Sequence, residues 1–177
     1  RSHCDWSSDV CSSDLGEVHT LLGENGAGKT VIANILSGYY GKTAGEIRVK
    51  GRPVDLQSPR DGLRHGIAMV HQELMLVPAF TIAQNVMIGL QASSFSFPLR
   101  KVEKRIAELS ARYQLKGDPK ARVEDLSAGE QQRAEILKVL FHEPEVLLLD
   151  EPTSLLTPQE ADHLFVVLRA MAQEGKG

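Results

Sequence analysis

The sequence predicts an α/β fold, in which helices cover the faces of a parallel sheet. Three observations support this prediction. Short apolar runs typical of buried strands alternate with amphipathic segments typical of helices. A glycine-rich loop lies directly between the first such strand and the helix that follows it, and residues 78–140 show helical patterns without a convincing strand. We therefore expect a core of residues 16–77 and 141–177, with residues 78–140 inserted as a helical subdomain.

Each expected element has a local signal. Strands are expected at 17–22, 46–50, 67–70 and 145–149, where apolar or alternating runs end in turn residues. Helices are expected at 31–36, from Pro59, at 81–90, 101–113, 127–141 and 157–173. A Ser or Thr followed three residues later by Gln or Glu, as in Thr81–Gln84, predicts a capped helix start. The 101–113 helix is amphipathic, with Val102, Ile106 and Leu109 on one face.

The composition predicts a globular domain. The chain has 177 residues, of which 42% are hydrophobic and 24% charged, and its net charge is −3. This balance argues against a nucleic acid as partner. The strongest apolar run, Val146 to Leu149, is far shorter than the roughly 20 residues that a membrane helix needs, so any membrane role is expected to come through a partner.

The first fifteen residues differ from the rest of the chain. They contain both cysteines, the only tryptophan and a near-repeat of Ser-Ser-Asp. Residues 5–15 look like the translation of a sequencing adapter, so we interpret residues 1–15 as a non-native or disordered segment joined to a genuine reading frame near Gly16. Because the chain also ends in Gly175-Lys176-Gly177, where another strand should follow, we expect it to be truncated at both ends.

The glycine-rich loop predicts a phosphate-binding site. It follows the pattern G-x-x-x-x-G-K-[ST], and its residues are Gly23, Glu24, Asn25, Gly26, Ala27, Gly28, Lys29 and Thr30. Glycines let main-chain N–H groups curl around an anion, and the helix that follows adds the positive end of its dipole. The ammonium group of Lys29 is expected to bind the β- and γ-phosphates of a nucleotide, and the Thr30 hydroxyl to bind Mg²⁺. The pattern predicts a P-loop nucleotide-binding protein.

Two carboxylates follow the apolar run at 146–149. In a parallel sheet, the carboxyl ends of the strands face the crevice where ligands bind. Asp150 is therefore expected to hold Mg²⁺, and Glu151 to orient or deprotonate a water molecule aimed at the γ-phosphate. The alternative is that the two acids merely end a strand.

Further motifs identify a family. Ser127-Ala128-Gly129-Glu130-Gln131-Gln132-Arg133, preceded by a leucine, is locally a capping box, but it also resembles the LSGGQ signature of ATP-binding-cassette (ABC) ATPases. Val70-His71-Gln72-Glu73 resembles their Q-loop, and Asp150-Glu151-Pro152-Thr153-Ser154 resembles their Walker B continuation. With the phosphate loop, these motifs occur in the family's order and cover nearly all of residues 16–173. The resemblance implies a P-loop NTPase (RecA-like) core with an antiparallel β edge and a helical insertion.

The resemblance also implies a head-to-tail dimer with ATP between two cassettes. Ser127, Gly129 and Glu130 would then contact ATP held by the phosphate loop of the other cassette. Gln72 would sense Mg²⁺ and the attacking water in its own cassette, so it is a catalytic and a metal-site candidate together with Glu151 and Asp150. Its loop would couple the ATPase to a membrane subunit.

Finer similarity points to the first ATPase half of simple-sugar and nucleoside importers. Leu156-Thr157-Pro158-Gln159-Glu160 is one of the stretches that carries it. The implied partners are transmembrane permease subunits, a second cassette and, indirectly, a periplasmic or extracellular solute-binding protein. The implied location is the cytoplasmic face of the membrane.

Two alternatives stay open. One is a soluble ABC-type ATPase acting in translation or DNA maintenance, and the other is an inactive fragment that only binds nucleotide. The family's adenine-stacking aromatic residue and switch histidine have no counterpart in a matching motif, and an aspartate is missing at Thr157. We therefore expect this chain to bind nucleotide weakly and to hydrolyse little.

Overall fold

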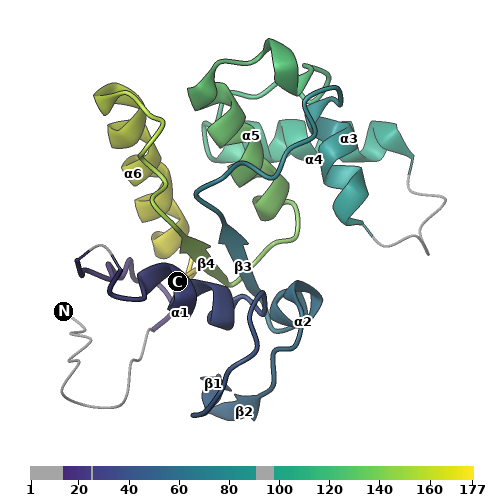
Figure 1. The fold of residues 1–177 in the computed structure, drawn as a ribbon. Helices are drawn as coiled ribbons and strands as arrows, with labels where there is room; N and C mark the ends of the chain where they lie inside the picture. The colour runs from purple at the N-terminus through teal and green to yellow at the C-terminus, as the bar shows by residue number, and fades with distance from the viewer. Residues whose placement is uncertain (1–13, 25, 91–97) are drawn as a thin grey trace. The chain divides into compact units, whose positions relative to one another are not determined.

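The computed structural model describes residues 14–24, 26–90 and 98–177 (Figure 1). By their internal contacts, these residues form two compact units. The first unit contains the chain up to Met69 together with residues 144–150 and 168–177, and the second contains residues 70–143 and 151–167. The predicted limits of the helical subdomain, 78 and 140, stay a prediction. The expected non-native segment lies outside the described residues, apart from Asp14 and Leu15.

The first unit begins with a helix and a hairpin. Helix α1 spans Lys29–Leu36, and strands β1 (Ile47–Val49) and β2 (Arg52–Val54) pair antiparallel with Ile47 opposite Val54. The hairpin turn consists of Lys50 and Gly51, which both have positive φ, 52° and 75°. Two consecutive residues with positive φ form a turn whose twist matches the right-handed twist of the paired strands. The predicted antiparallel strands are thus present, as a sheet of their own, although the sequence analysis expected no strand at the residues of β2.

The parallel sheet is represented by two strands. Strand β3 (Ile67–Val70) pairs with β4 (Val146–Leu149), and Figure 1 shows their arrows running in the same direction. Helix α2 (Pro59–Arg64) precedes β3, and the Ser58 side chain accepts a hydrogen bond at its N-terminus. The residues of β3 are buried, whereas those of β4 are only half-buried. The predicted α/β class is confirmed.

One predicted strand is absent. Residues 17–22 form no helix or strand, and Val18 and Leu22 are 54% and 77% exposed. The prediction of a buried strand here was wrong. A strand is stable only when neighbouring strands satisfy its main-chain groups, and the apolar pattern reports only that its side chains favour burial.

The second unit is built from helices. Helices α3 (Ile82–Gly89), α4 (Leu99–Arg112) and α5 (Ala128–Leu140) all contact one another, and a short 3₁₀ helix, η2 (Val123–Asp125), precedes α5. Helix α6 (Pro158–Gln173) begins in this unit and continues into the first at Leu168. Thr81 and Ser127 form capping boxes at the starts of α3 and α5, as predicted.

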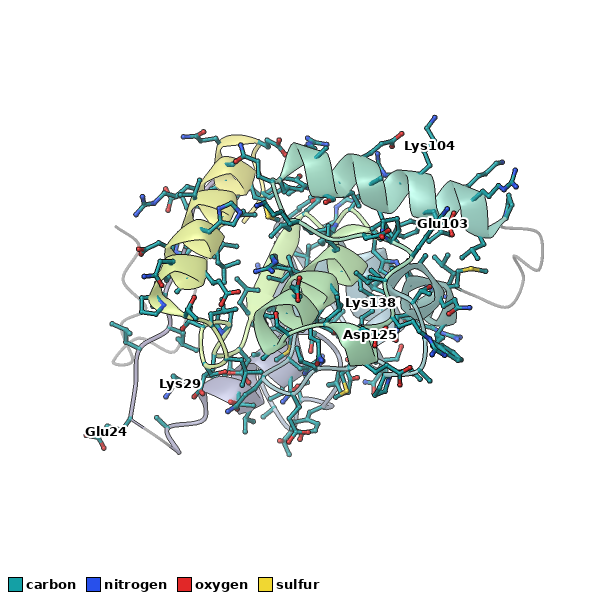
Figure 2. All side chains as sticks on the ribbon, turned by 90° about the horizontal axis from the view of Figure 1, so that it is seen from above. Glu24, Lys29, Glu103, Lys104, Asp125 and Lys138 are labelled. Atoms are coloured by element: carbon teal, nitrogen blue, oxygen red, sulfur yellow. The ribbon has the colours of Figure 1, made fainter. Side chains whose placement is uncertain are left out.

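The amphipathic pattern of α4 decides which of its faces is buried. Val102 and Ile106 are completely buried and Leu109 is 3% exposed, which confirms the predicted apolar face. Figure 2 shows Lys104 pointing away from the neighbouring helices, and its side chain is 80% exposed. Among the described residues, no helix combines the length and apolar character that crossing a bilayer requires.

Candidate nucleotide site

The glycine-rich loop of the first unit closes around its own lysine. The Lys29 ammonium group donates to the main-chain oxygens of Gly23 and Glu24, at 2.6 and 2.9 Å. The N–H of Ala27 donates to the Glu24 oxygen at 3.1 Å, which tightens the same turn. An ammonium group has three donors, so Lys29 retains one for a phosphate oxygen. Asn25, also predicted to bind nucleotide, lies outside the described residues.

Backbone conformation explains why glycine occupies positions 26 and 28 of the loop. Gly26 and Gly28 have φ of 85° and 89°, values that other residues rarely adopt, whereas a Cβ at either position would meet nothing within 4 Å. Gly28 is also the N-cap of α1, and no side chain caps this helix end. The first N–H groups of α1 therefore lack side-chain partners at its N-terminus, and such a helix end favours an anion.

A carboxylate lies beside the first turn of α1. The Thr30 hydroxyl donates to Oδ1 of Asp150 at 3.3 Å, across 120 residues of sequence. Thr30 is the second residue of α1 and Asp150 directly follows β4, so the strand brings the carboxylate to the phosphate loop. Within the part of the chain that the structure describes, no group of three His, Cys, Asp or Glu side chains could hold a metal ion by itself. A hydroxyl and one carboxylate nevertheless suit Mg²⁺, which usually keeps several waters and binds substrate phosphates.

Gln72 and Glu151 meet in the second unit. The Gln72 side-chain amide donates to Oε2 of Glu151 at 3.2 Å, and both side chains are exposed. Glu151 has a φ of 46°, a left-handed conformation that costs a residue with a Cβ about 1 kcal/mol or more. The backbone here is strained, which is common where a side chain has to be aimed at a functional site.

The Ser127 side chain is part of the capping box at the start of α5. Its hydroxyl donates to Oε2 of Glu130 at 2.8 Å, and the Glu130 N–H donates back to the hydroxyl oxygen at 3.4 Å. The Ser127 N–H also donates to Oε2, at 2.9 Å. These two donors hold the pKa of the Glu130 carboxyl below its usual value. A phosphate oxygen that bound Ser127 would therefore compete with Glu130 for the same hydroxyl.

The Glu160 carboxylate, which the sequence analysis did not predict as functional, lies against Gly129 of the Ser127–Arg133 motif. A Cβ placed on Gly129 would come within 2.1 Å of Oε1 of Glu160. Arg133 donates to that same oxygen at 3.0 Å, and the N–H and hydroxyl of Thr157 each donate to Oε2 at 3.0 Å. Thr157 first and Arg133 second hold the pKa of Glu160 below its usual value. The Thr157–Glu160 spacing is a capping pattern, but no sequence signal pairs Glu160 with α5.

The predicted site residues thus fall into two groups. In the first unit, the structure brings the phosphate loop together with Asp150. In the second unit, it brings Gln72 to Glu151 and Ser127 to Glu130, while Gly129 lies against Glu160.

Comparisons with known proteins agree with these motifs. The sequence model of the ABC transporter family matches residues 11–154. The chain is 45% identical over 162 residues to the nucleoside import ATP-binding protein NupA of Lactococcus lactis, and 44% identical over 162 residues to the guanosine import ATP-binding protein NupO of Bacillus subtilis. Each match covers 91% of this chain but 32% of the relative, so the chain spans about a third of the length of these relatives.

A solved structure gives the same result. CbiO1 from Clostridium perfringens, part of the ABC transporter complex cbiONQ, superposes with a TM-score of 0.73 at 29% identity, over 90% of this chain and 64% of that one. The family match contains the phosphate loop, Gln72, the Ser127–Arg133 motif and the carboxylates Asp150 and Glu151. Because it covers most of the sequence and every one of these motifs, the chain belongs to the ABC transporter family.

Proposed function

We propose that this chain is the ATP-binding and ATP-hydrolysing part of an importer for a nucleoside or a simple sugar. One observation carries the proposal: the phosphate loop is folded around Lys29 at the start of α1, and Thr30 lies within hydrogen-bond distance of Asp150. Relatives at 44–45% identity, whose names describe nucleoside and guanosine import, support the choice of an importer.

ATP binding relies on the main chain and on one cation. The N–H groups of the loop from Gly23 to Thr30 and the N-terminus of α1 surround the phosphates, and the third donor of the Lys29 ammonium group binds a phosphate oxygen. The first turn of α1 contains no acidic residue of its own, which favours an anion at this helix end. The Thr30 hydroxyl and Asp150 would hold Mg²⁺, which when bound neutralises charge on the β- and γ-phosphates.

Hydrolysis requires an oriented water molecule and a proton acceptor. The oxygen of the water molecule attacks the γ-phosphorus while Glu151 accepts a proton from the water. The bond between the γ-phosphorus and the bridging oxygen breaks, and ADP leaves. The Gln72 amide, 3.2 Å from Glu151, holds this carboxylate and orients the water. The left-handed backbone at Glu151 fixes the direction of its side chain.

A second cassette completes the site. Ser127, Gly129 and Glu130 lie at the N-terminus of α5, a helix end that favours a phosphate of ATP bound by another copy or a tandem cassette. Binding of that phosphate would release the Ser127 hydroxyl from Glu130. ATP hydrolysis would then depend on closure of two cassettes.

The membrane partner is a permease subunit. The segment that follows Gln72 carries three exposed apolar side chains, Met75, Val77 and Phe80, with 49%, 40% and 40% exposed. Exposed apolar groups of this kind suit a protein partner, and here they lie next to a residue of the hydrolytic site. The chain would bind the cytoplasmic face of the membrane through the permease, and the solute-binding protein would act from the opposite side.

Two variants of this chain test the proposal. Lys29→Ala removes the cation of the phosphate loop, so the Kd for a fluorescent ATP analogue is expected to rise about 100-fold. Glu151→Gln is expected to leave this Kd unchanged and to lower the rate of phosphate release about 10²- to 10⁴-fold. Lys42→Ala, which removes a lysine paired with Asp55 in the same unit, is the control and changes neither value.

Each outcome decides a separate part of the proposal. Unchanged affinity in Lys29→Ala would contradict the phosphate loop as the nucleotide site. If the affinity is normal but the wild type and Glu151→Gln release phosphate at the same rate, the protein binds nucleotide and Glu151 does not contribute to hydrolysis.

A further inference from the structure

The segment from Gln72 to Phe80, called here the Gln72–Phe80 segment, has no helix or strand, yet its main chain is held firmly. In a segment without regular structure, each main-chain N–H and C=O needs a partner from elsewhere or from water. Two side chains from two different helices supply partners here: Asn85 of α3 and Lys138 of α5.

Asn85 binds both main-chain polar groups of Val77. Its Oδ1 accepts the N–H of Val77 at 2.7 Å, and its Nδ2 donates to the oxygens of Val77 and Thr81, both at 3.1 Å. Both amide protons of Asn85 are therefore used. Asn85 is 4% exposed, so losing these bonds would leave buried polar groups without partners.

Lys138 holds the same segment two residues earlier. Its ammonium group donates to the Met75 oxygen at 2.7 Å and lies 2.8 Å from Oε1 of Glu135. Glu135 is 1% exposed, and its second oxygen has no hydrogen-bond partner. A buried carboxylate strongly favours a nearby cation, so Glu135 keeps the Lys138 side chain in place under Met75.

The last residues of the segment are held by main-chain N–H groups of η2. The N–H groups of Glu124 and Val123 donate to the main-chain oxygens of Pro78 and Phe80, both at 3.0 Å. The main chain from Met75 to Phe80 is thus fixed at four residues. Between Met75 and Gln72 there are only three steps of chain, which together span at most about 11 Å.

We propose that Asn85 and Lys138 are positioning residues for Gln72. By fixing Met75 and Val77, they limit where the Gln72 amide can reach and keep it at the Glu151 carboxylate. This inference rests on the hydrolytic role of Gln72 given under Proposed function. It explains why a buried asparagine and a half-buried lysine, the latter with a buried ion-pair partner, bind a segment whose own side chains are largely exposed.

The first experiment measures position without hydrolysis. NMR spectra of the wild type, Asn85→Ala and Lys138→Met are compared, with the Gln72 side-chain NH₂ signals assigned through their loss in Gln72→Ala. Hydrogen exchange of the Val77 amide is expected to be about 10-fold or more faster in Asn85→Ala. The Gln72 side-chain signals are expected to shift in both variants. Unchanged Gln72 signals in both variants would overturn the proposal.

The choice of controls separates position from general loss of stability. Lys138→Arg keeps a donor for the Met75 oxygen and is expected to restore the wild-type signals. The double variant Glu135→Gln with Lys138→Met removes the Met75 bond without leaving an unpaired buried charge, so it serves if Lys138→Met does not fold. Lys104→Met removes a lysine whose side chain is 80% exposed and is expected to change nothing (Figure 2).

The second experiment measures kcat and nucleotide affinity separately. Asn85→Ala and Lys138→Met are expected to lower kcat for ATP hydrolysis about 10- to 100-fold while the Kd for ATP stays within about 2-fold. A shifted Gln72 signal with unchanged kcat would overturn the proposal. A wild type that binds ATP without hydrolysing it would instead contradict the proposed function, and the NMR result would still decide whether Asn85 and Lys138 position Gln72.

Discussion

The Gln72 side-chain amide donates a hydrogen bond to Glu151 at 3.2 Å, although 79 residues separate the two. Gln72 follows β3 and Glu151 follows Asp150 at the end of β4, so the pairing of these two strands brings the ends of both chain segments together. An amide at this distance can hold a carboxylate in one orientation. This contact yields the first prediction.

Replacing Gln72 with alanine is expected to lower the rate of ATP hydrolysis by about 10- to 100-fold, because Glu151 loses the group that orients it. The Kd for ATP is expected to stay within about 2-fold, since Gln72 is not part of the phosphate loop. The measurement is single-turnover hydrolysis next to nucleotide titration. Gln57→Ala, which removes an exposed glutamine bonded to Asp55, is the control. An equal loss in both variants would contradict the role of Gln72.

A methyl group at Gly129 is expected to destabilise the second unit. In Gly129→Ala, the new Cβ would lie 2.1 Å from Oε1 of Glu160, and Arg133 and Thr157 hold this carboxylate in place. We expect the free energy of unfolding, measured with urea, to fall by about 1–3 kcal/mol.

Glu160→Ala provides the matching test. Added to Gly129→Ala, it removes the clashing atom, so the double variant should lose less stability than the sum of the two single variants. Additive losses would show that the contact between Gly129 and Glu160 does not set the cost.

Two capping boxes allow stability and nucleotide contact to be separated. Thr81→Ala and Ser127→Ala each remove the capping hydroxyl of a helix, and each is expected to lower the free energy of unfolding by about 1 kcal/mol. Only Ser127→Ala is expected to weaken ATP-dependent dimerisation, measured by light scattering with Glu151→Gln in the background. Equal dimerisation in both variants would contradict the contact of Ser127 with a second cassette.

The pH dependence of stability is expected to include a contribution from His142. Burial first, and the charge of Lys138 second, hold the pKa of His142 below its usual value of about 6.5. As the pH falls through this value, the unfolded chain binds a proton that the folded chain does not. The free energy of unfolding therefore falls as the pH falls, and this contribution is complete only above the unfolded pKa.

His142→Gln removes this titration. Between pH 7.5 and 5.5, the variant is expected to lose less stability than the wild type in urea unfolding, because the carboxylates that titrate lower are common to both proteins. Identical slopes in the two proteins would contradict a lowered pKa of His142.

The sequence by itself determined the local features of this protein. Capping at Thr81 and Ser127 depends on residues three positions apart, and the buried stripe of α4 depends on the helical period, so both can be predicted from neighbours in the chain. The phosphate loop was predictable for the same reason, because its lysine and glycines act within eight residues. The family followed from four such motifs in order.

Only the tertiary structure decided which distant groups meet. The apolar pattern at 17–22 predicted a strand, but a strand also needs paired main-chain partners, and that requirement is not written in its own residues. The contacts of Glu160 with Arg133 and of Lys138 with Met75 join segments 27 and 63 residues apart. Such contacts depend on how helices and loops pack, and short-range sequence patterns carry no information about that packing.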